Sequence, residues 1–352
     1  MKVINEIISN ISGIDQELVK KTQARLDNLT KPLGSLGRLE ELAKQICGIT
    51  GKDYPVLGNK VIFTLAADHG VTDEGVSAYP KEVTAQMVYN FLANGAAINV
   101  LANHVGARVV VADVGVVSEL KPNPRLLIKK VNNGTKNMAK GPAMTKEEAI
   151  KAITTGIGIF EDEFKRGADI VGTGEMGIGN TTAASAITAC FIKQSIEEIT
   201  GRGAGLDDKG LKNKVEIIKK ALLVNKPDSS DAIDVLSKVG GFEIGGLVGI
   251  ILAASSKKIP IVIDGFISGA AALIAYKLEP KVKDYMIAAH KSVEGGHRFI
   301  LDYIGLKPLI DLDLRLGEGT GGALGIGLAD AAIKILTQMA TFESANVSER
   351  GK

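Results

Sequence analysis

Short runs of β-branched and apolar residues recur along this chain, and each ends in a polar residue or a glycine. The runs lie at residues 61–65, 109–112, 170–171, 261–263 and 285–287, between segments with helical spacing. Continuous apolar runs are typical of strands that are buried on both faces. Their alternation with helices predicts a parallel sheet wrapped by helices, so the sequence indicates the α/β class.

Both ends of the chain have helical patterns instead. Residues 4–50 show helical spacing, and Gly48 is expected to end a helix there. The apolar stripe of that helix consists of Leu36, Leu39, Leu42 and Ile46. Beyond residue 323 a second apolar stripe precedes a polar tail from about Ser344. The two ends could pack together as a small second layer.

The composition argues against several kinds of partner. The 352 residues include 42 basic and 40 acidic ones, a formal charge of +2, and no basic stripe with interleaved aromatic residues suits a phosphate backbone. Cys47 and Cys190 are too few for a disulfide framework or a zinc site, which fits a reducing cytoplasm. The longest apolar stretch, residues 244–254, is too short to cross a bilayer. We expect a cytoplasmic protein that has no membrane span and binds no nucleic acid.

A glycine-rich segment follows the strand expected at residues 170–171. It reads GTGEMGIGNTT at residues 172–182 and leads into a helix of small residues. A glycine loop between a strand and a helix presents backbone N–H groups and the positive helix end to an anion, with Asn180 or Thr181 placed to cap the helix. Phosphate is the ligand that this pattern favours.

The same segment formally matches a dinucleotide-binding fingerprint, through Gly172, Gly174 and Gly177. The match is poor, because Glu197 and Glu198 lie in a polar helical stretch where a strand-end acid for the ribose would be required. A Walker A loop is also excluded, since no lysine stands at the required position.

A further glycine cluster at residues 201–208 precedes a basic helix that contains Lys212 and Lys214. A basic residue there could complete a phosphate cradle, but a charge run at the start of a helix is also typical of a solvated face. The sequence alone leaves both interpretations open.

The segment RLGEGTGG at residues 315–322 places Glu318 among four glycines. Such glycines permit left-handed torsions and close approach to a ligand, so the carboxylate can be presented into a cleft. The alternative is a solvated loop acid. The phosphate-type loop at residues 172–182 favours the cleft.

Strand ends carry Asp68, His69, Asp113 and Asp264, where open α/β sheets place ligand groups. His69 has no second histidine at metal-ligand spacing, and no serine elbow accompanies it. We expect structural or substrate-positioning roles for Asp68, His69 and Asp264. Asp113 and Asp264 are single acids, which argues against a magnesium-pyrophosphate donor.

Together these segments resemble the nicotinate-nucleotide:dimethylbenzimidazole phosphoribosyltransferases of cobalamin lower-ligand synthesis, nearly end to end. The matching motifs are KPLGSLGRLE at 31–40, ADHGV at 67–71, GEMGIGNTT at 174–182, DVLSKVGGF at 234–242, DGF at 264–266 and RLGEGTG at 315–321. The resemblance implies a Rossmann-like sheet with flanking helices and a homodimer. It also implies a small helical domain of residues 1–58 plus 323–352 beside a large α/β domain of residues 59–322.

The resemblance also implies the chemistry. Glu318 matches the family's general base, which takes the N–H proton of 5,6-dimethylbenzimidazole so that the ring nitrogen attacks C1′ of nicotinate mononucleotide. The products are nicotinate and alpha-ribazole 5′-phosphate. Neither a metal nor a cofactor is implied, because the donor already carries a cationic leaving group. Glu175 is the second acid expected in the site, as a positioning group or secondary base.

Binding roles follow from the positions of residues within the matched motifs. The phosphate and ribose are expected to contact Gly174, Gly177, Asn180, Gly203, Lys214, Ser292 and Arg315. The base is expected to contact Tyr79, Gln86 and Met87, although Met87 is equally consistent with core packing. Ala204, Asn94 and Gly322 depart from residues common in the family, and they leave the choice of acceptor base open.

Two other functions remain as alternatives. The glycine fingerprint would suit a nicotinamide-dinucleotide oxidoreductase, although the ribose-binding acid is missing. A protein that only binds and delivers the azole or its nucleotide would bind without turnover, and Glu318 between its glycines argues against it.

Overall fold

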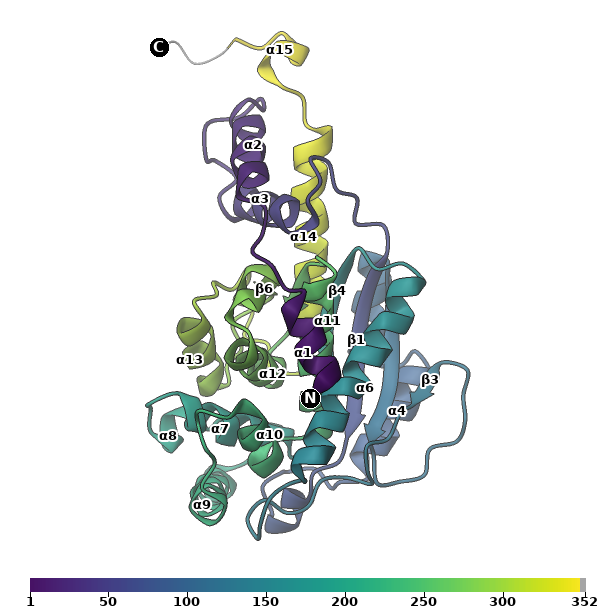
Figure 1. Cartoon of the computed structure of the whole chain (residues 1–352), viewed down its shortest axis with the longest axis vertical. Helices are drawn as coiled ribbons and strands as arrows, with labels where there is room; N and C mark the ends of the chain where they lie inside the picture. The colour runs from purple at the N-terminus through teal and green to yellow at the C-terminus, as the bar shows by residue number, and fades with distance from the viewer. Residues whose placement is uncertain (349–352) are drawn as a thin grey trace.

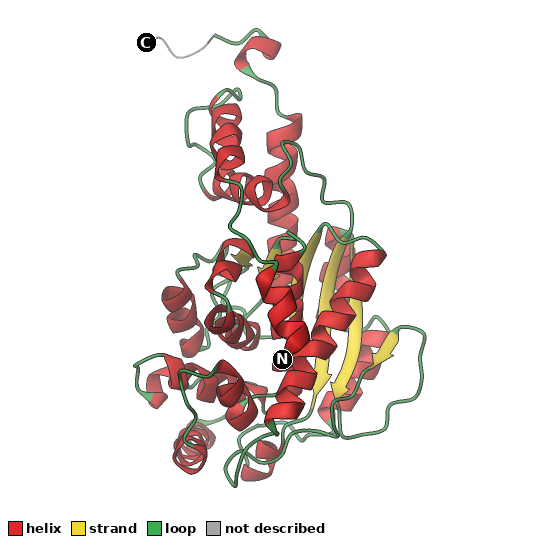
Figure 2. Cartoon of the chain, in the orientation of Figure 1, coloured by secondary structure: helices red, strands yellow, loops and turns green. Residues whose placement is uncertain are grey.

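A six-stranded, fully parallel sheet forms the centre of the computed structural model, which describes residues 1–348 (Figures 1 and 2). The strand order is β3-β2-β1-β4-β5-β6. The strands are β1 (Lys60–Ala67), β2 (Ala107–Gly115), β3 (Leu126–Ile128), β4 (Ile170–Met176), β5 (Ile261–Ile263) and β6 (Met286–Ala288). All five strands expected from the sequence are present, and the α/β class is confirmed.

The edge strand β3 was not predicted. It consists of three residues that pair with Val111–Asp113 of β2. An apolar triplet is too short to show a period, so the sequence does not distinguish it from a loop.

Helices cover both faces of the sheet (Figure 2). The α-helices of the described residues are α1 (Lys2–Ser9), α2 (Gln16–Asp27), α3 (Arg38–Thr50), α4 (Val83–Leu92), α5 (Ala97–Val105), α6 (Lys146–Lys165), α7 (Asn180–Phe191), α8 (Ile196–Ile199), α9 (Asp208–Asn225), α10 (Ala232–Val239), α11 (Phe242–Ser256), α12 (Phe266–Leu278), α13 (Gly295–Ile304), α14 (Thr320–Gln338) and α15 (Phe342–Ala345). Two short 3₁₀ helices span Gly70–Glu74 and Pro280–Tyr285.

Gly48 does not end α3, so this expectation was wrong. The helix continues to Thr50, and Gly51 follows in the left-handed conformation with φ of 67°. A Cβ at Gly48 would lie 2.7 Å from Val19 Cγ2, so this glycine serves the close approach of α2. A glycine at a helix crossing and a glycine at a helix end are alike in a sequence.

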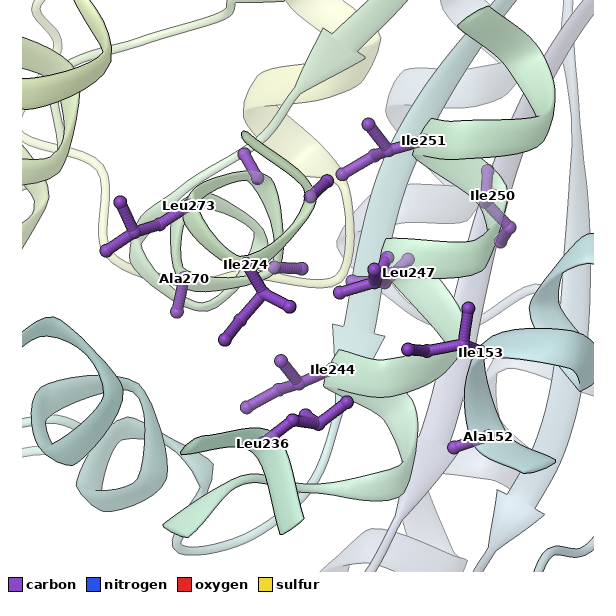
Figure 3. Packing of buried hydrophobic residues seen from close by; sticks show 14 of the residues in the cluster. Ala152, Ile153, Leu236, Ile244, Leu247, Ile250, Ile251, Ala270, Leu273 and Ile274 are labelled. Carbon is purple, nitrogen blue, oxygen red and sulfur yellow. The ribbon is translucent and has the colours of Figure 1, made fainter. Parts of the chain in front are cut away.

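The main core lies where α11 packs against α6 and α12 (Figure 3). Apart from Glu243 near its start, α11 is apolar on all sides, as is typical of a helix that is buried along almost its entire length. A Cβ at Gly156 of α6 would overlap the carbonyl oxygen of Gly246, and one at Gly249 would overlap that of Ile153. Glycines therefore allow these two helices to pack backbone against backbone.

The helices from the two chain ends gather beyond the amino ends of the strands. In Figure 1, α2, α3, the second half of α14 and α15 lie together, and the long strands point away from them. Arg25 Nε donates to Leu336 O at 2.7 Å across this group. The predicted division into two domains stays a prediction, with one qualification: α1, inside residues 1–58, lies against α6 and α11 of the large part.

Among the described residues, only α14 combines the length and apolarity that a membrane span requires. In this fold 56% of that apolar stretch is buried. Its first half packs under the sheet, where Ile326 lies against Gly172 of β4. The core helix of a globular protein meets the same criterion.

Candidate active site

Two glycine-rich segments meet at the centre of the sheet. Gly172 and Gly174 lie inside β4, and Gly174 pairs with Thr64 of β1. A Cβ at Gly174 would overlap the carbonyl oxygen of Glu318, in the segment before α14. The missing side chains on β4 therefore let the second segment approach closely and place Glu318 against the sheet.

The turn from β4 into α7 differs from the prediction. The sequence indicated a loop throughout residues 172–182, with Asn180 or Thr181 as the helix cap. β4 instead continues to Met176, and Gly179, with φ of 90°, is the N-cap. Gly179 has no side chain to cap the first N–H groups of α7, and this helix end borders a pocket. Such a helix end is suited to an anion.

Glu318 is a non-glycine residue in the left-handed region, with φ of 63° between two glycines of positive φ. Its carbonyl oxygen accepts a hydrogen bond from Thr64 Oγ1 at 2.9 Å, and its Oε2 accepts one from the backbone N–H of Ile98 at 3.2 Å. Only 5% of the residue is exposed. Burial raises the pKa of Glu318, and the charge of Asp264 adds to this effect. A carboxyl with a raised pKa is suited to accept a proton.

The pocket beside Glu318 has a volume of about 350 Å³ and combines polar and apolar walls. Its lining comprises Val76, Ser77, Tyr79, Val83, Met87, Glu175, Met176, Gly177, Ile178, Gly179, Asn180, Thr181, Gly203, Ala204, Ile267, Arg315, Leu316 and Glu318. These residues come from the segment before α4, from α4 itself, from the end of β4 through the start of α7, from the start of α12, and from the loops before α9 and α14. The pocket lies at the carboxyl side of the parallel strands, where open α/β sheets bind ligands.

Glu175 lies at the end of β4 and is also only 5% exposed. Asn180 Nδ2 donates a hydrogen bond to its Oε2. Burial, followed by the neighbouring charge of Glu243, raises the pKa of Glu175 to about 8. Glu175 is therefore largely protonated at neutral pH, which suits a hydrogen-bond donor better than a base.

Lys214 of α9 lies behind the opposite wall and is fully buried. Its Nζ donates to Thr181 Oγ1 at 2.7 Å and to Gly201 O at 3.3 Å. Burial lowers the pKa of Lys214 to about 8, against the opposing effect of Glu294. The solvated-face alternative is wrong for Lys214, while Lys212 is exposed.

Glu294 was missed in the sequence. Its Oε1 accepts the backbone N–H of Gly203 at 2.9 Å, so it holds the glycine loop that borders the pocket. A partial signal was present, because two glycines follow Glu294, although no glycine precedes it as Gly317 precedes Glu318. Ser292 lies next to it, with its Oγ accepting the N–H of Glu294 at 3.3 Å.

The strand-end groups outside the pocket are engaged in structural contacts. Asp68 Oδ2 accepts the N–H of Val117 at 2.7 Å, and His69 Nε2 lies 2.6 Å from Glu243 Oε1. Burial opposes protonation of His69, but Glu243 outweighs it, so the pKa of His69 is raised. Within residues 1–348, no group of three or more histidine, cysteine or acidic side chains could hold a metal ion.

The family model described as phosphoribosyltransferase matches residues 11–347. The chain belongs to this family. A nicotinate-nucleotide–dimethylbenzimidazole phosphoribosyltransferase of Geobacter sulfurreducens is 56% identical over 349 residues, 99% of each chain. The equally named protein of Geobacter metallireducens is 56% identical over 352 residues, 100% of this chain and 99% of the relative. A crystal structure of the enzyme from Thermus thermophilus has a TM-score of 0.90 at 46% identity, covering 96% of this chain and 100% of that one.

Membership of the phosphoribosyltransferase family confirms the resemblance carried by the motifs. It also argues against the alternative of a nicotinamide-dinucleotide oxidoreductase. The fold gives a physical reason against that alternative as well. Gly172 and Gly174 lie inside a strand, whereas a dinucleotide fingerprint requires its glycines in the turn.

The pocket brings together most of the predicted site residues of this phosphoribosyltransferase. The predicted residues on its wall are Glu318, Glu175, Gly177, Asn180, Gly203, Arg315, Tyr79 and Met87. Gly174 and Lys214 back the wall without lining it, and Ser292 is buried next to Glu294 and does not line the pocket. Gln86 is exposed on α4 and does not line the pocket. The roles of all these residues stay predictions.

Proposed function

We propose that this phosphoribosyltransferase transfers the phosphoribosyl group of nicotinate mononucleotide to 5,6-dimethylbenzimidazole or a related base. The names of its full-length relatives support this substrate pair. The observation that carries the proposal is Glu318, a buried carboxylate held between glycines on the wall of a 350 Å³ pocket that the start of α7 also lines.

In the proposed reaction the Glu318 carboxylate accepts the N–H proton of the benzimidazole. The ring nitrogen forms a bond to C1′ of the donor, the bond from C1′ to nicotinate breaks, and the configuration at C1′ inverts. The electron pair of the broken bond neutralises the pyridinium, so nicotinate leaves without protonation. This donor supplies its own leaving group, and the proposal therefore requires no metal or cofactor.

The donor's 5′-phosphate would lie against the start of α7, near Asn180 and Gly203. The helix end and the backbone N–H groups favour a dianion there. Lys214 would add a positive charge from behind Thr181. Its Nζ lies 3.2 Å from the position that a Cβ on Gly203 would occupy. Arg315, exposed at the edge of the pocket, would contact the donor from the side of Glu318.

The base would lie between the apolar residues of the other wall. Tyr79 and Met87 line the pocket there, and Leu316 and Ile267 add apolar surface. The α4 helix that carries Met87 is fixed to the β4–α7 turn, since Thr84 Oγ1 accepts the N–H of Ile178 at 3.1 Å. A flat aromatic base suits such a wall. As the family resemblance implies, we also propose a homodimer that works in the cytoplasm.

The test is to incubate the purified protein with nicotinate mononucleotide and 5,6-dimethylbenzimidazole without added metal, and to follow nicotinate and the new nucleotide by chromatography. Equal amounts of both products are expected from the wild type. Glu318→Gln keeps the shape of the side chain but cannot accept the proton, so its rate of product formation should fall by about 10²- to 10⁴-fold. Glu119→Gln, an exposed acid far from the pocket residues in sequence, is the control and should match the wild type.

The alternative of a binding-only protein predicts a different result. It would bind the azole, measurable by calorimetry, and release no nicotinate with any of several benzimidazoles. If Glu318→Gln still formed the products at the wild-type rate, the proposed reaction would stand, but Glu318 would not be its general base.

A further inference from the structure

We infer that Asp264 is a positioning residue for Glu318: from the end of β5, its carboxylate caps α14 and fixes the segment that presents Glu318 to the pocket. The inference rests on the proposed role of Glu318. It assigns a reaction-specific task to an acid that lines no part of the pocket.

The first step concerns the start of α14. Its N-cap is Gly319, which has no side chain to accept the first N–H groups of the helix. Asp264 supplies the missing acceptors from another element. Its Oδ2 accepts the N–H of Gly319 at 3.2 Å, and its Oδ1 accepts the N–H of Gly322 at 2.9 Å. A carboxylate at this position also opposes the positive end of the helix.

The second step concerns the anchoring of Asp264 itself. It is 1% exposed, and its backbone N–H donates to Thr173 Oγ1 of β4 at 3.1 Å. Glu318 is held from its other side by Thr64 of β1. Two central strands and β5 therefore fix the segment that holds Glu318 in the left-handed region, a conformation that is unfavourable for a residue with a side chain.

The third step concerns His290, which follows β6 and is buried beside Asp264. Its Nε2 lies 3.8 Å from Asp264 Oδ1. A Cβ at Gly321 would overlap the His290 ring and lie 2.9 Å from Asp264 Oδ1. His290, Asp264 and the start of α14 thus lie in close contact, and Gly321 leaves the space that the His290 ring and the Asp264 carboxylate occupy.

The charges around this cluster give the inference a measurable consequence. Glu175, Glu318 and His290 face Asp264, and Glu243 lies beyond Glu175. Burial raises the pKa of Asp264, while His290 and the N–H groups at the start of α14 oppose this and favour its charge. In turn that charge adds to the effect of burial on the pKa of Glu318. Removal of the charge should lower the pKa of Glu318.

Asp113 provides a matched control. It is also a buried aspartate that accepts backbone N–H groups, since its Oδ1 accepts those of Gly115 at 3.0 Å and Val116 at 2.8 Å. It lies in β2 and holds a loop that does not carry Glu318. Asp113→Asn thus carries a comparable structural cost without the link to the base.

The experiment measures kcat/KM against pH for the wild type, Asp264→Asn, Asp113→Asn and Glu318→Gln, together with thermal unfolding of each. The acid limb of kcat/KM reports protonation of the free enzyme's base, and substrate ionisations are common to all variants. We expect Asp264→Asn to lose about 10²-fold in plateau activity, as misplacement of a reacting group does. Its acid limb should move to lower pH, while that of Asp113→Asn stays at the wild-type position.

An Asp264→Asn profile that matches Asp113→Asn in plateau and acid limb would overturn the inference. If Asp264→Asn does not fold, His290→Phe decides. It keeps the carboxylate but removes the ring that favours its charge, so the acid limb should shift in the same direction, and an unmoved limb overturns the inference. Wild-type behaviour of Glu318→Gln would refute the base itself, a distinguishable failure.

Discussion

The two walls of the pocket carry ionisable groups of opposite charge, and burial shifts the pKa values of these groups in opposite directions. On the wall of α14, burial raises the pKa of Glu318, and on the β4 side it raises that of Glu175. On the wall of α9, burial lowers the pKa of Lys214 to about 8. Removal from water favours the uncharged forms of Glu318, Glu175 and Lys214. Glu318 can thus accept a proton at the wall of α14, while Lys214 can still place a positive charge near an anion bound at the wall of α9.

The largest expected effect separates the two walls by kinetics. Glu318→Gln removes proton transfer, so kcat should fall by about 10²- to 10⁴-fold, with the KM for nicotinate mononucleotide little changed. Lys214→Met keeps the length of the buried chain but removes the charge. It should raise that KM by about 10- to 100-fold, the equivalent of one lost charged hydrogen bond. Steady-state kinetics with varied donor measures both.

Lys212→Met is the control for the phosphate wall, since Lys212 lies on the same helix and is exposed. It should leave the KM unchanged. The unliganded Lys214 loses its charge as pH rises through about 8, so the wild-type KM should rise there while that of Lys214→Met stays flat in comparison. The division of the pocket would be contradicted if the KM rose equally with pH in the wild type and in Lys214→Met. It would also be contradicted if Lys214→Met lowered kcat alone.

A smaller effect concerns stability and distinguishes the two acids. The pKa of Glu175 is about 8 in the fold, above its ordinary value of 4.5. Between these values the folded protein binds more protons than the unfolded chain, so the free energy of unfolding falls as pH rises. Glu175→Gln lacks this dependence. It should be about as stable as the wild type at pH 5 and more stable above pH 8, by an amount on the order of a few kcal/mol.

Urea unfolding at both pH values measures this difference. The exposed Glu119→Gln should show no such gain at high pH. Equal stability of Glu175→Gln and the wild type at pH 9 would mean that Glu175 ionises readily. Glu175 would then be available as a base beside Glu318, and the contrast between the two acids would disappear.

The features of the fold and site that could be predicted from the sequence are those set by residues close together in the chain. The five long or apolar strands and the Glu318 motif are local patterns, and they were recognised. The short strand β3 and the helix cap at Gly179 were not, because a triplet has no period and because several glycines in one run compete for the turn. The phosphate contact expected of Gly174 stays a prediction, and the sequence did not indicate that this glycine also makes room for Glu318.

The partners of the site residues are the part that local pattern could not supply. Asp264 and Glu318 are 54 residues apart in the chain, and Thr64 and Ile98 are still more distant from Glu318. Their hydrogen bonds depend on the order of the strands, which places β5, β4 and β1 side by side. A single sequence reports strands but not their order. The network behind the base therefore required the structure.

The smallest expected effect tests the wall for the acceptor base. Met87 lines the pocket and also packs against the neighbouring core, whereas Gln86, next to it on α4, is exposed outside the pocket. Met87→Ala should raise the KM for 5,6-dimethylbenzimidazole several-fold through lost apolar contact, on the order of 1 kcal/mol. Gln86→Ala should leave it unchanged, as measured with saturating nicotinate mononucleotide. A larger effect of Gln86→Ala would mean that α4 turns when the base binds, so that the base wall, unlike the phosphate wall, forms only with its ligand.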